Sequence, residues 1–394
     1  MAYFSEQEMT RRLDRLRQCM DDTGVDAVLV TSVHNTLYYS NFWMIPWGRQ
    51  QGLVIPREGE PTVIAPRIEY DRPARMIGDG SAFRDIRIYT DNASAIDGWV
   101  GLAREVLREG GITTGRIGIE EDNVSITMHK TLCASLSGLE FVEMGYAMMR
   151  EQMHKSDEEI TLIRDGAGIC DIGAQAFVDA VTEGVTEVQV ARAAVTAMEE
   201  EICRRFPGEE CDGSFCWAQS GAENTKVAHA LNTDRQMQRG DLLSLNVFPM
   251  ILGYYHLLER SLVFGPISDE VQKYFDIQVE VHQAGIEALK PGVRLGDIDD
   301  AVINPIYEKY GLLENRTFGT GHSFGIMGYW YGRDELGEIR PYNDYLLQPG
   351  MVMSMEPMIA LDGVGGFKHA DMLLITENSN ERLTRFRNDV IVIP

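Results

Sequence analysis

Apolar residues in the first part of the chain alternate between helical spacing and short continuous runs. Over 6–22 they recur every three or four residues, which predicts an amphipathic helix capped by Ser5. Two apolar runs at 52–56 and 61–65 flank a polar turn and predict a β-hairpin. Further helical stretches alternate with short strands up to residue 143, so we expect an α/β domain.

The pattern changes near residue 155. Ser156 is followed three residues later by Glu159, which is the spacing of a capping box, and a helical apolar pattern continues from there. A chain of 394 residues is also long enough for two domains. We therefore predict an N-terminal domain over 1–154 and a second domain over 155–394.

The composition is acidic. Asp and Glu number 60 against 36 Lys and Arg, a formal net charge of −24, so neither nucleic acid nor an anionic membrane is an expected partner. The six cysteines are scattered without a Cys-x-x-Cys pair, which is typical of reduced cytosolic thiols. The N-terminal residues lack the features of a signal peptide, and no apolar run approaches the roughly 18 residues of a membrane span. We expect a cytoplasmic protein.

Three stretches after residue 240 combine His, Asn and carboxylates. They read Asp241-Leu-Leu-Ser-Leu-Asn246 running to Tyr254-Tyr-His-Leu-Leu-Glu-Arg260, then Gly319-Thr-Gly-His-Ser-Phe-Gly325, then Ser354-Met-Glu-Pro357. These stretches resemble the pita-bread family, which includes methionine aminopeptidase, prolidase, aminopeptidase P and creatinase. The resemblance implies an α+β second domain with a curved antiparallel sheet and internal pseudo-symmetry.

A faint repeat in the second domain agrees with that implication. Gly184-Val and Gly292-Val each introduce a predicted helix that follows an earlier helix. The repeat is weak by itself, but the pita-bread fold consists of two related halves.

The family's metalloenzymes hold two divalent ions with two Asp, one His and two Glu. The resemblance places these five positions at Asn246, Leu257, His322, Glu356 and Ala370. Two such ions require several anionic oxygens, which an amide and two aliphatic side chains do not supply. We therefore expect no metal and no other cofactor, and a pocket whose carboxylates favour a cation.

Within the family, the chain resembles the metal-free creatinases, which hydrolyse creatine to sarcosine and urea, more than the peptidases. The similarity covers nearly the whole chain. The stretches that carry it are 32–49, 244–255, 258–260, 316–319, 321–325, 331–333 and 349–358.

This resemblance implies catalytic roles for His229, Glu259 and Glu356. His229 would transfer the proton, because imidazole has a pKa close to neutrality. Glu259 and Glu356 would hold a planar amidinium or guanidinium through charge-assisted hydrogen bonds. Structural interpretations are open for each: His229 as a core histidine, Glu259 in a local salt bridge with Arg260, and Glu356 as a remnant of the metal site.

The resemblance also implies five substrate-binding residues. Arg49 and Arg333 would bind a carboxylate with their forked guanidinium groups, with Arg49 supplied by the other subunit of a homodimer. Tyr255 and His322 would line the pocket, although Tyr255 also suits core packing and an arginine is often a surface charge. Trp47 would contribute one wall.

Two departures from the creatinase pattern bear on the substrate. Trp47 replaces a Phe, and Ala370 replaces a His. His369 is adjacent, but neighbouring residues of a strand point to opposite faces, so it would not substitute for the missing group.

We interpret the chain as a metal-independent hydrolase of C–N bonds in linear amidines, acting on a small zwitterion for which creatine is the first candidate. The alternatives are hydrolysis of another amidine carboxylate such as ectoine, and a small-ligand binding protein without catalysis. Retained metallopeptidase activity is the least favoured.

Overall fold

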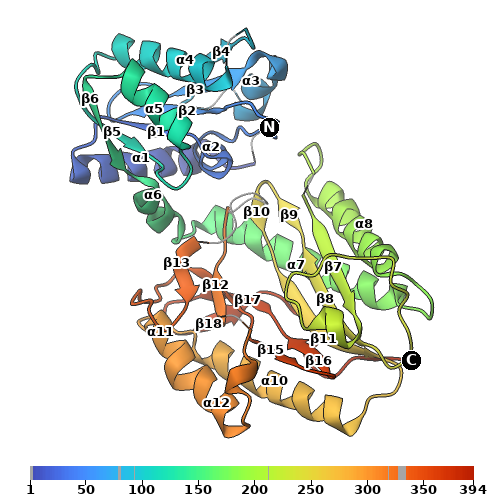
Figure 1. Cartoon of the computed structure of the whole chain (residues 1–394). Coiled ribbons are helices and arrows are strands. Elements are labelled where there is room, and N and C mark those ends of the chain that lie inside the picture. The colour runs from blue at the N-terminus through green and yellow to red at the C-terminus, as the bar shows by residue number, and fades with distance from the viewer. Residues whose placement is uncertain (1–2, 79–80, 93, 212, 318, 327–333) are drawn as a thin grey trace. The chain divides into compact units, whose positions relative to one another are not determined.

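The computed structural model describes residues 3–78, 81–92, 94–211, 213–317, 319–326 and 334–394. The chain forms two compact units, Met1–Gln152 and Met153–Pro394. Each unit contains both helices and sheets (Figure 1). None of the helices in this described part of the chain has the length and hydrophobicity that a membrane span requires.

The first unit is built on a six-stranded mixed sheet with the strand order β4-β3-β2-β1-β5-β6. The strands are β1 (Ala27–Val30), β2 (Gly52–Pro56), β3 (Thr62–Pro66), β4 (Asp85–Tyr89), β5 (Gly115–Ile119) and β6 (Leu139–Glu143). The helices are α1 (Glu6–Thr23), α2 (Val33–Ser40), α3 (Arg72–Ile77), α4 (Ala95–Glu109), α5 (Ile126–Ser135) and α6 (Gly145–Gln152), with a short 3₁₀ turn η1 (Arg67–Glu69).

Local signals in the sequence determine several of these elements. The Ser5 side chain accepts a hydrogen bond from the backbone N–H of Glu8, and Gly24 ends α1 in the left-handed conformation at φ 65°. The apolar face of α1 is buried, as its periodicity predicts. The hairpin is also present, because β2 and β3 pair antiparallel with Gly52 opposite Ile64. The expected α/β architecture of this unit is confirmed.

The second unit contains two main antiparallel sheets, ordered β19-β11-β8-β7 and β13-β12-β14-β17-β18. The strands are β7 (Phe215–Ser220), β8 (Leu242–Phe248), β9 (Met250–Ile251), β10 (Tyr254–Tyr255), β11 (Leu258–Phe264), β12 (Gly321–Ser323), β13 (Asp334–Ile339), β14 (Val352–Met355), β15 (Met358–Leu361), β16 (Gly365–Lys368), β17 (Asp371–Ile375), β18 (Asn380–Arg382) and β19 (Val392–Ile393). Only the β11–β19 pair among the named pairs of these sheets is parallel.

Helices cover these sheets in two groups (Figure 1). The helices are α7 (Asp157–Ala180), α8 (Glu187–Arg205), α9 (Gly221–Thr225), α10 (Asp269–Ala288), α11 (Leu295–Asp297) and α12 (Asn304–Lys309), with a π turn η2 (Ile298–Ile303) and a 3₁₀ turn η3 (Leu313–Asn315). The capping box at Ser156 and Glu159 starts α7, as predicted.

The internal repeat is visible in backbone contacts. Gly184 and Gly292 both adopt positive φ, at 81° and 83°. The N–H of Gly184 donates to the carbonyl of Met237, and the N–H of Gly292 donates to that of Leu347. In each half, helices are followed by antiparallel strands, which is the pseudo-symmetry expected for the pita-bread fold.

Candidate functional site

A row of cross-strand neighbours runs through the second unit. Trp217 pairs with Asn246, Asn246 pairs with Glu259, and Glu259 pairs with Ala370. The last pair exchanges two backbone hydrogen bonds, with N–O distances of 3.2 and 3.0 Å, and so joins the two main sheets. Directly opposed residues project to the same face of a sheet. This row therefore places the Glu259 carboxylate on one face, between Asn246 and Ala370.

Glu259 forms a buried ion pair that the sequence analysis missed. Lys368 Nζ lies 2.8 Å from Glu259 Oε1, and the two side chains are 3% and 4% exposed. Glu259 Oε2 is also buried and has no hydrogen-bond partner among the described residues. From the sequence we expected carboxylates that are free to bind a cation, and in the structure one of them, Glu259, already has a protein cation as its partner.

Burial raises the pKa of Glu259, and the negative charge of Glu356 raises it further. The ammonium group of Lys368 and the charge of His229 act in the opposite direction. Both other predicted catalytic residues therefore lie close enough to interact electrostatically with Glu259.

The alternative interpretation of Glu259, a local salt bridge with Arg260, does not describe the structure. Arg260 points to the opposite side of β11, where its Nη2 lies 2.9 Å from Asp371 Oδ1. Its Nη1 donates to the backbone carbonyls of Glu259 and Ala370 at 2.7 and 2.8 Å. Arg260 therefore fixes the backbone of the row from behind, without contacting the Glu259 carboxylate.

Glu356 and His322 form a second pair. His322 Nε2 lies 3.2 Å from Glu356 Oε1, and the side chains are 12% and 10% exposed. The other ring nitrogen, Nδ1, lies 2.9 Å from the carbonyl oxygen of Ser323. The His322 ring stacks on Phe324 with centroids 4.8 Å apart. The Glu356 N–H donates to Thr320 O at 2.7 Å, so both partners are fixed by neighbouring backbone.

His229 lies in the exposed segment between α9 and β8. Gln219 on β7 holds this segment, because its Nε2 donates to the carbonyls of Val227, Ala228 and Ala230 at 2.9, 3.3 and 3.3 Å. The His229 ring lies 5.2 Å from the ring of Trp217, centroid to centroid. The histidine is therefore next to the row that contains Glu259, and it is not a core histidine.

Tyr255 is buried in an aromatic cluster at the end of the sheet that contains β7 and β8. Its ring lies 5.8 Å from Phe215, and Phe215 stacks on Phe248 at 4.4 Å. Its N–H donates to the carbonyl of Gly325, at 3.3 Å, three residues after His322. Tyr255 thus joins the aromatic wall beside Trp217 to the strand that carries His322.

The remaining predicted residues do not lie in the row of Glu259 or beside Glu356 within the described structure. Arg333 lies outside the described residues. In the first unit, Trp47 is 78% exposed at φ 45°, and Arg49 Nε lies 3.0 Å from Asp91 Oδ2. His369 packs against Phe275 with ring centroids 5.0 Å apart, on the helix side of the sheet and away from Glu259.

The side chains at the family's metal positions do not fit two divalent ions. Asn246 uses its amide N–H groups on the carbonyls of Trp217 and Ser244, at 2.9 and 3.1 Å. Leu257 and Ala370 have no donor atoms. His322 and Glu356 remain, and two ligands without further anionic oxygens do not hold a dinuclear centre. No cluster of three or more potential ligand side chains occurs within the described part of the chain.

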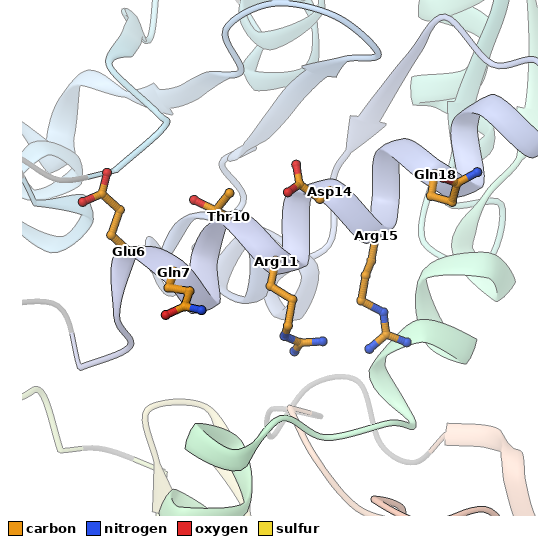
Figure 2. Close-up of a pocket in the computed structure, with 7 residues that line it drawn as sticks. All are labelled: Glu6, Gln7, Thr10, Arg11, Asp14, Arg15 and Gln18. Carbon is orange, nitrogen blue, oxygen red and sulfur yellow. The ribbon is translucent and has the colours of Figure 1, made fainter.

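A concave surface runs along α1, in the first unit (Figure 2). Its charged side chains include Arg11, which pairs with Glu8, and Arg15, which pairs with Glu151. None of the predicted site residues contributes to it. The residues that line it are Glu6, Gln7, Thr10, Arg11, Asp14, Arg15 and Gln18.

Lys368 is the residue beside Glu259 that sequence reasoning missed. A single lysine within the apolar and glycine-rich stretch Gly365-Gly-Phe-Lys368 was the available signal. A lysine is rarely fully buried unless it is paired, so its position in a strand between buried residues could have suggested a carboxylate partner.

Comparison with known proteins agrees with this geometry. Residues 12–153 match the model of the creatinase/prolidase N-terminal domain, and residues 161–377 match metallopeptidase family M24. The chain is 43% identical to a creatinase from Bacillus sp. (strain B-0618), over 97% of this chain and 92% of that protein. It is 25% identical to an Xaa-Pro dipeptidase from Pyrococcus furiosus, over 97% and 100% of the two chains.

Solved structures show the same fold. A prolidase from Thermococcus sibiricus superimposes with a TM-score of 0.83 at 23% identity, covering 97% of this chain and 98% of the prolidase. An Xaa-Pro dipeptidase from Bacillus anthracis gives a TM-score of 0.82 at 21% identity, covering 98% and 99%.

Proposed function

We propose that this chain, which belongs to metallopeptidase family M24 and contains a creatinase/prolidase N-terminal domain, is a metal-independent amidinohydrolase that converts creatine and water into sarcosine and urea. The observation that carries the proposal is Glu259. Its Oε2 is buried without a partner in the described structure, close to Glu356 and His229. A buried carboxylate oxygen without a partner is costly, and an N–H group of a cationic ligand would satisfy it.

Creatine fits this site chemically. It has a planar guanidinium at one end and a carboxylate at the other. Glu259 and Glu356 would hold the guanidinium, and the imidazole of His322, 3.2 Å from Glu356, would fix the orientation of that carboxylate. The 43% identity to a creatinase over nearly the whole chain supports the same substrate.

The reaction requires a proton to be moved from water to a nitrogen. His229 accepts a proton from a water molecule, whose oxygen forms a bond to the central guanidinium carbon. The tetrahedral intermediate then breaks its bond to the methylated nitrogen, and His229 returns the proton to that nitrogen. Addition of the water oxygen ends the delocalisation of the cation and gives a neutral adduct. Positive charge returns on the methylated nitrogen when His229 protonates it, and the remaining C–OH group loses its proton as urea forms. A carboxylate beside this localised charge stabilises it more than it stabilises the delocalised ground state.

The carboxylate end of the substrate would be bound by Arg333 and by Arg49. We propose that Arg49 and Trp47 act in the site of a second subunit, so that the active enzyme is a homodimer. The present contact of Arg49 with Asp91 is partly exposed, and such pairs exchange partners at little cost. None of the six cysteines, all of them described, forms a disulfide, which supports a cytoplasmic location.

Hydrolysis of a cyclic amidine carboxylate such as ectoine is the second candidate. Two observations favour it: the aliphatic Ala370 beside Glu259, and the exposed indole of Trp47, which could stack on a ring. In that reaction a carboxylate would attack directly as the nucleophile.

Product analysis separates these possibilities. Purified protein is dialysed against EDTA and incubated with creatine or ectoine, and the products are identified by chromatography. Steady formation of urea and sarcosine supports the proposal, while ring opening of ectoine alone supports the second candidate. Calorimetric binding of creatine without any product would instead indicate a binding protein. Activity that EDTA abolishes and a divalent ion restores would refute metal independence.

A further inference from the structure

Lys368 occupies a position that the proposed mechanism does not use. Its ammonium group is 2.8 Å from Glu259 Oε1, and it also lies 3.4 Å from the carbonyl oxygen of Ala228, the residue before His229. The lysine therefore touches both the carboxylate that would bind the substrate and the segment that carries the proposed base.

The backbone of Lys368 is fixed to the strand of Glu259. Ser261 Oγ accepts a hydrogen bond from the Lys368 N–H at 2.8 Å and donates to the Lys368 carbonyl at 3.3 Å. Ser261 and Glu259 are two residues apart on β11, so they project to the same face. Because both ends of the ion pair are anchored to one strand and both side chains are buried, the pair has a fixed position in the site.

We propose that Lys368 is a positioning residue: it binds Glu259 through Oε1 and leaves Oε2 as the single carboxylate oxygen that receives an N–H of the substrate's cationic end. The inference rests on the function proposed above and deepens it. A forked guanidinium grip requires both carboxylate oxygens, and Oε1 is committed to the ammonium group. Glu259 therefore accepts a single N–H from the cationic end of the substrate, through Oε2.

Lys368 also affects the charge of the site. Its ammonium group offsets the charge of Glu259, and Glu356, beside the His322 imidazole, is the second carboxylate available to the cationic end of the substrate. Without the lysine, Glu259 would be a buried carboxylate beside a second carboxylate, and it would protonate or move. Either change removes an ionised acceptor that matters most when charge localises in the transition state.

The kinetic test uses the full-length protein with Lys368→Met, which keeps the length of the side chain, and Lys368→Arg, which keeps its charge. We expect Lys368→Met to lower kcat for creatine at least tenfold with a smaller change in KM, and Lys368→Arg to recover most of the loss. Lys309→Met is the matched control, because Lys309 pairs with Glu280 at 3.0 Å through exposed side chains, and kcat should not change. A folded Lys368→Met variant with wild-type kcat and KM would overturn the inference.

A crystallographic test with guanidinium chloride does not depend on turnover or on a stable Lys368→Met variant. The inference requires a guanidinium nitrogen at Glu259 Oε2 while Lys368 Nζ stays on Oε1. Displacement of Lys368, or the absence of guanidinium from Oε2, would overturn it. If wild-type protein fails to hydrolyse creatine but binds guanidinium as described, the proposed substrate fails and the role of Lys368 stands.

Discussion

Arg260 and Asp371 form an ion pair, 2.9 Å from Nη2 to Oδ1, that is buried directly behind the proposed substrate face. Thr384 Oγ1 donates to the same Asp371 oxygen at 2.6 Å. Since Arg260 also binds the carbonyls of Glu259 and Ala370, this pair determines where the Glu259 backbone lies. Stability and site geometry are coupled at this position.

Asp371→Asn should therefore destabilise the second unit strongly. The change keeps the shape of the side chain but leaves the buried Arg260 without a counter-charge, which typically costs about 3–5 kcal/mol. Urea unfolding followed by tryptophan fluorescence measures the loss. Asp389→Asn is the control, because Asp389 pairs with Arg387 at the surface and both side chains are more than half exposed. Equal unfolding midpoints for the two variants would contradict the structural role of Asp371.

Gly166→Ala should be destabilising, and Gly168→Ala on the same helix should not. A Cβ at Gly166 would lie 2.0 Å from His256 Nε2, so the buried imidazole or α7 must move. Overpacking of this kind costs about 1–3 kcal/mol. A Cβ at Gly168 meets only the flexible end of Arg205, at 3.4 Å, and alanine gains about 0.5–1 kcal/mol over glycine within a helix. Thermal unfolding of both variants tests this contrast. Equal melting temperatures would show that α7 can shift to make room for the added methyl group.

The stability of the second unit should fall in mild acid because of His256. Burial lowers the pKa of this histidine from 6.5 to about 4, although its bond to the Pro249 carbonyl opposes the shift. As the pH falls, His256 is therefore protonated at a higher pH in the unfolded chain than in the folded chain. The contribution of His256 is complete above pH 6.5 and is lost as the pH falls toward 4, by about 3 kcal/mol in total at 1.36 kcal/mol per pKa unit.

His256→Gln should flatten this part of the stability curve, whatever its effect at neutral pH. The measurement is the free energy of unfolding in urea at several pH values between 4 and 7. An unchanged slope in the variant would assign the acid sensitivity to other groups.

His229→Ala should abolish most of the creatine turnover while the fold is retained. General acid–base catalysis contributes roughly 10²–10⁴ in rate, and kcat should fall by that factor. His229 is on an exposed segment held by Gln219 rather than in the core, so the melting temperature should change little. His129→Ala, at an exposed histidine of the first unit, is the control. A His229→Ala variant with near-wild-type kcat would show that another group moves the proton.

Sequence patterns predicted the elements that are stabilised by residues close to one another in the chain. The caps of α1 and α7 and the hairpin of β2 and β3 follow from neighbouring residues, and the structure confirms them. Helix α2 was not predicted. Its residues after Val33 are all buried, so no amphipathic pattern appears, and Asn35 is held by Glu120, 85 positions away.

The candidate site likewise contains features that short motifs reveal and features that depend on residues far apart in the chain. The family resemblance pointed to Glu259 and Glu356 as a pair of carboxylates and to His322 as a pocket residue, and the contact between His322 and Glu356 emerged only from the structure. The partner of Glu259 could not be read in this way. Lys368 lies more than 100 residues after Glu259 in the chain. The two side chains meet because the Glu259–Ala370 bridge brings the end of β16 next to β11. The resemblance to a known family carried the rest of the site assignment.

The two halves of the second unit repeat the same turn at Gly184 and Gly292, yet each supplies only part of the site. His229 and Glu259 come from one half, and His322 and Glu356 from the other. In the proposed function, the two halves thus each supply one glutamate carboxylate to the same ligand. What distinguishes them is the neighbour: an ammonium group at Glu259 and an imidazole at Glu356. The repeated scaffold therefore carries two carboxylates with unlike partners, so the two ends of a planar cation would meet different surroundings.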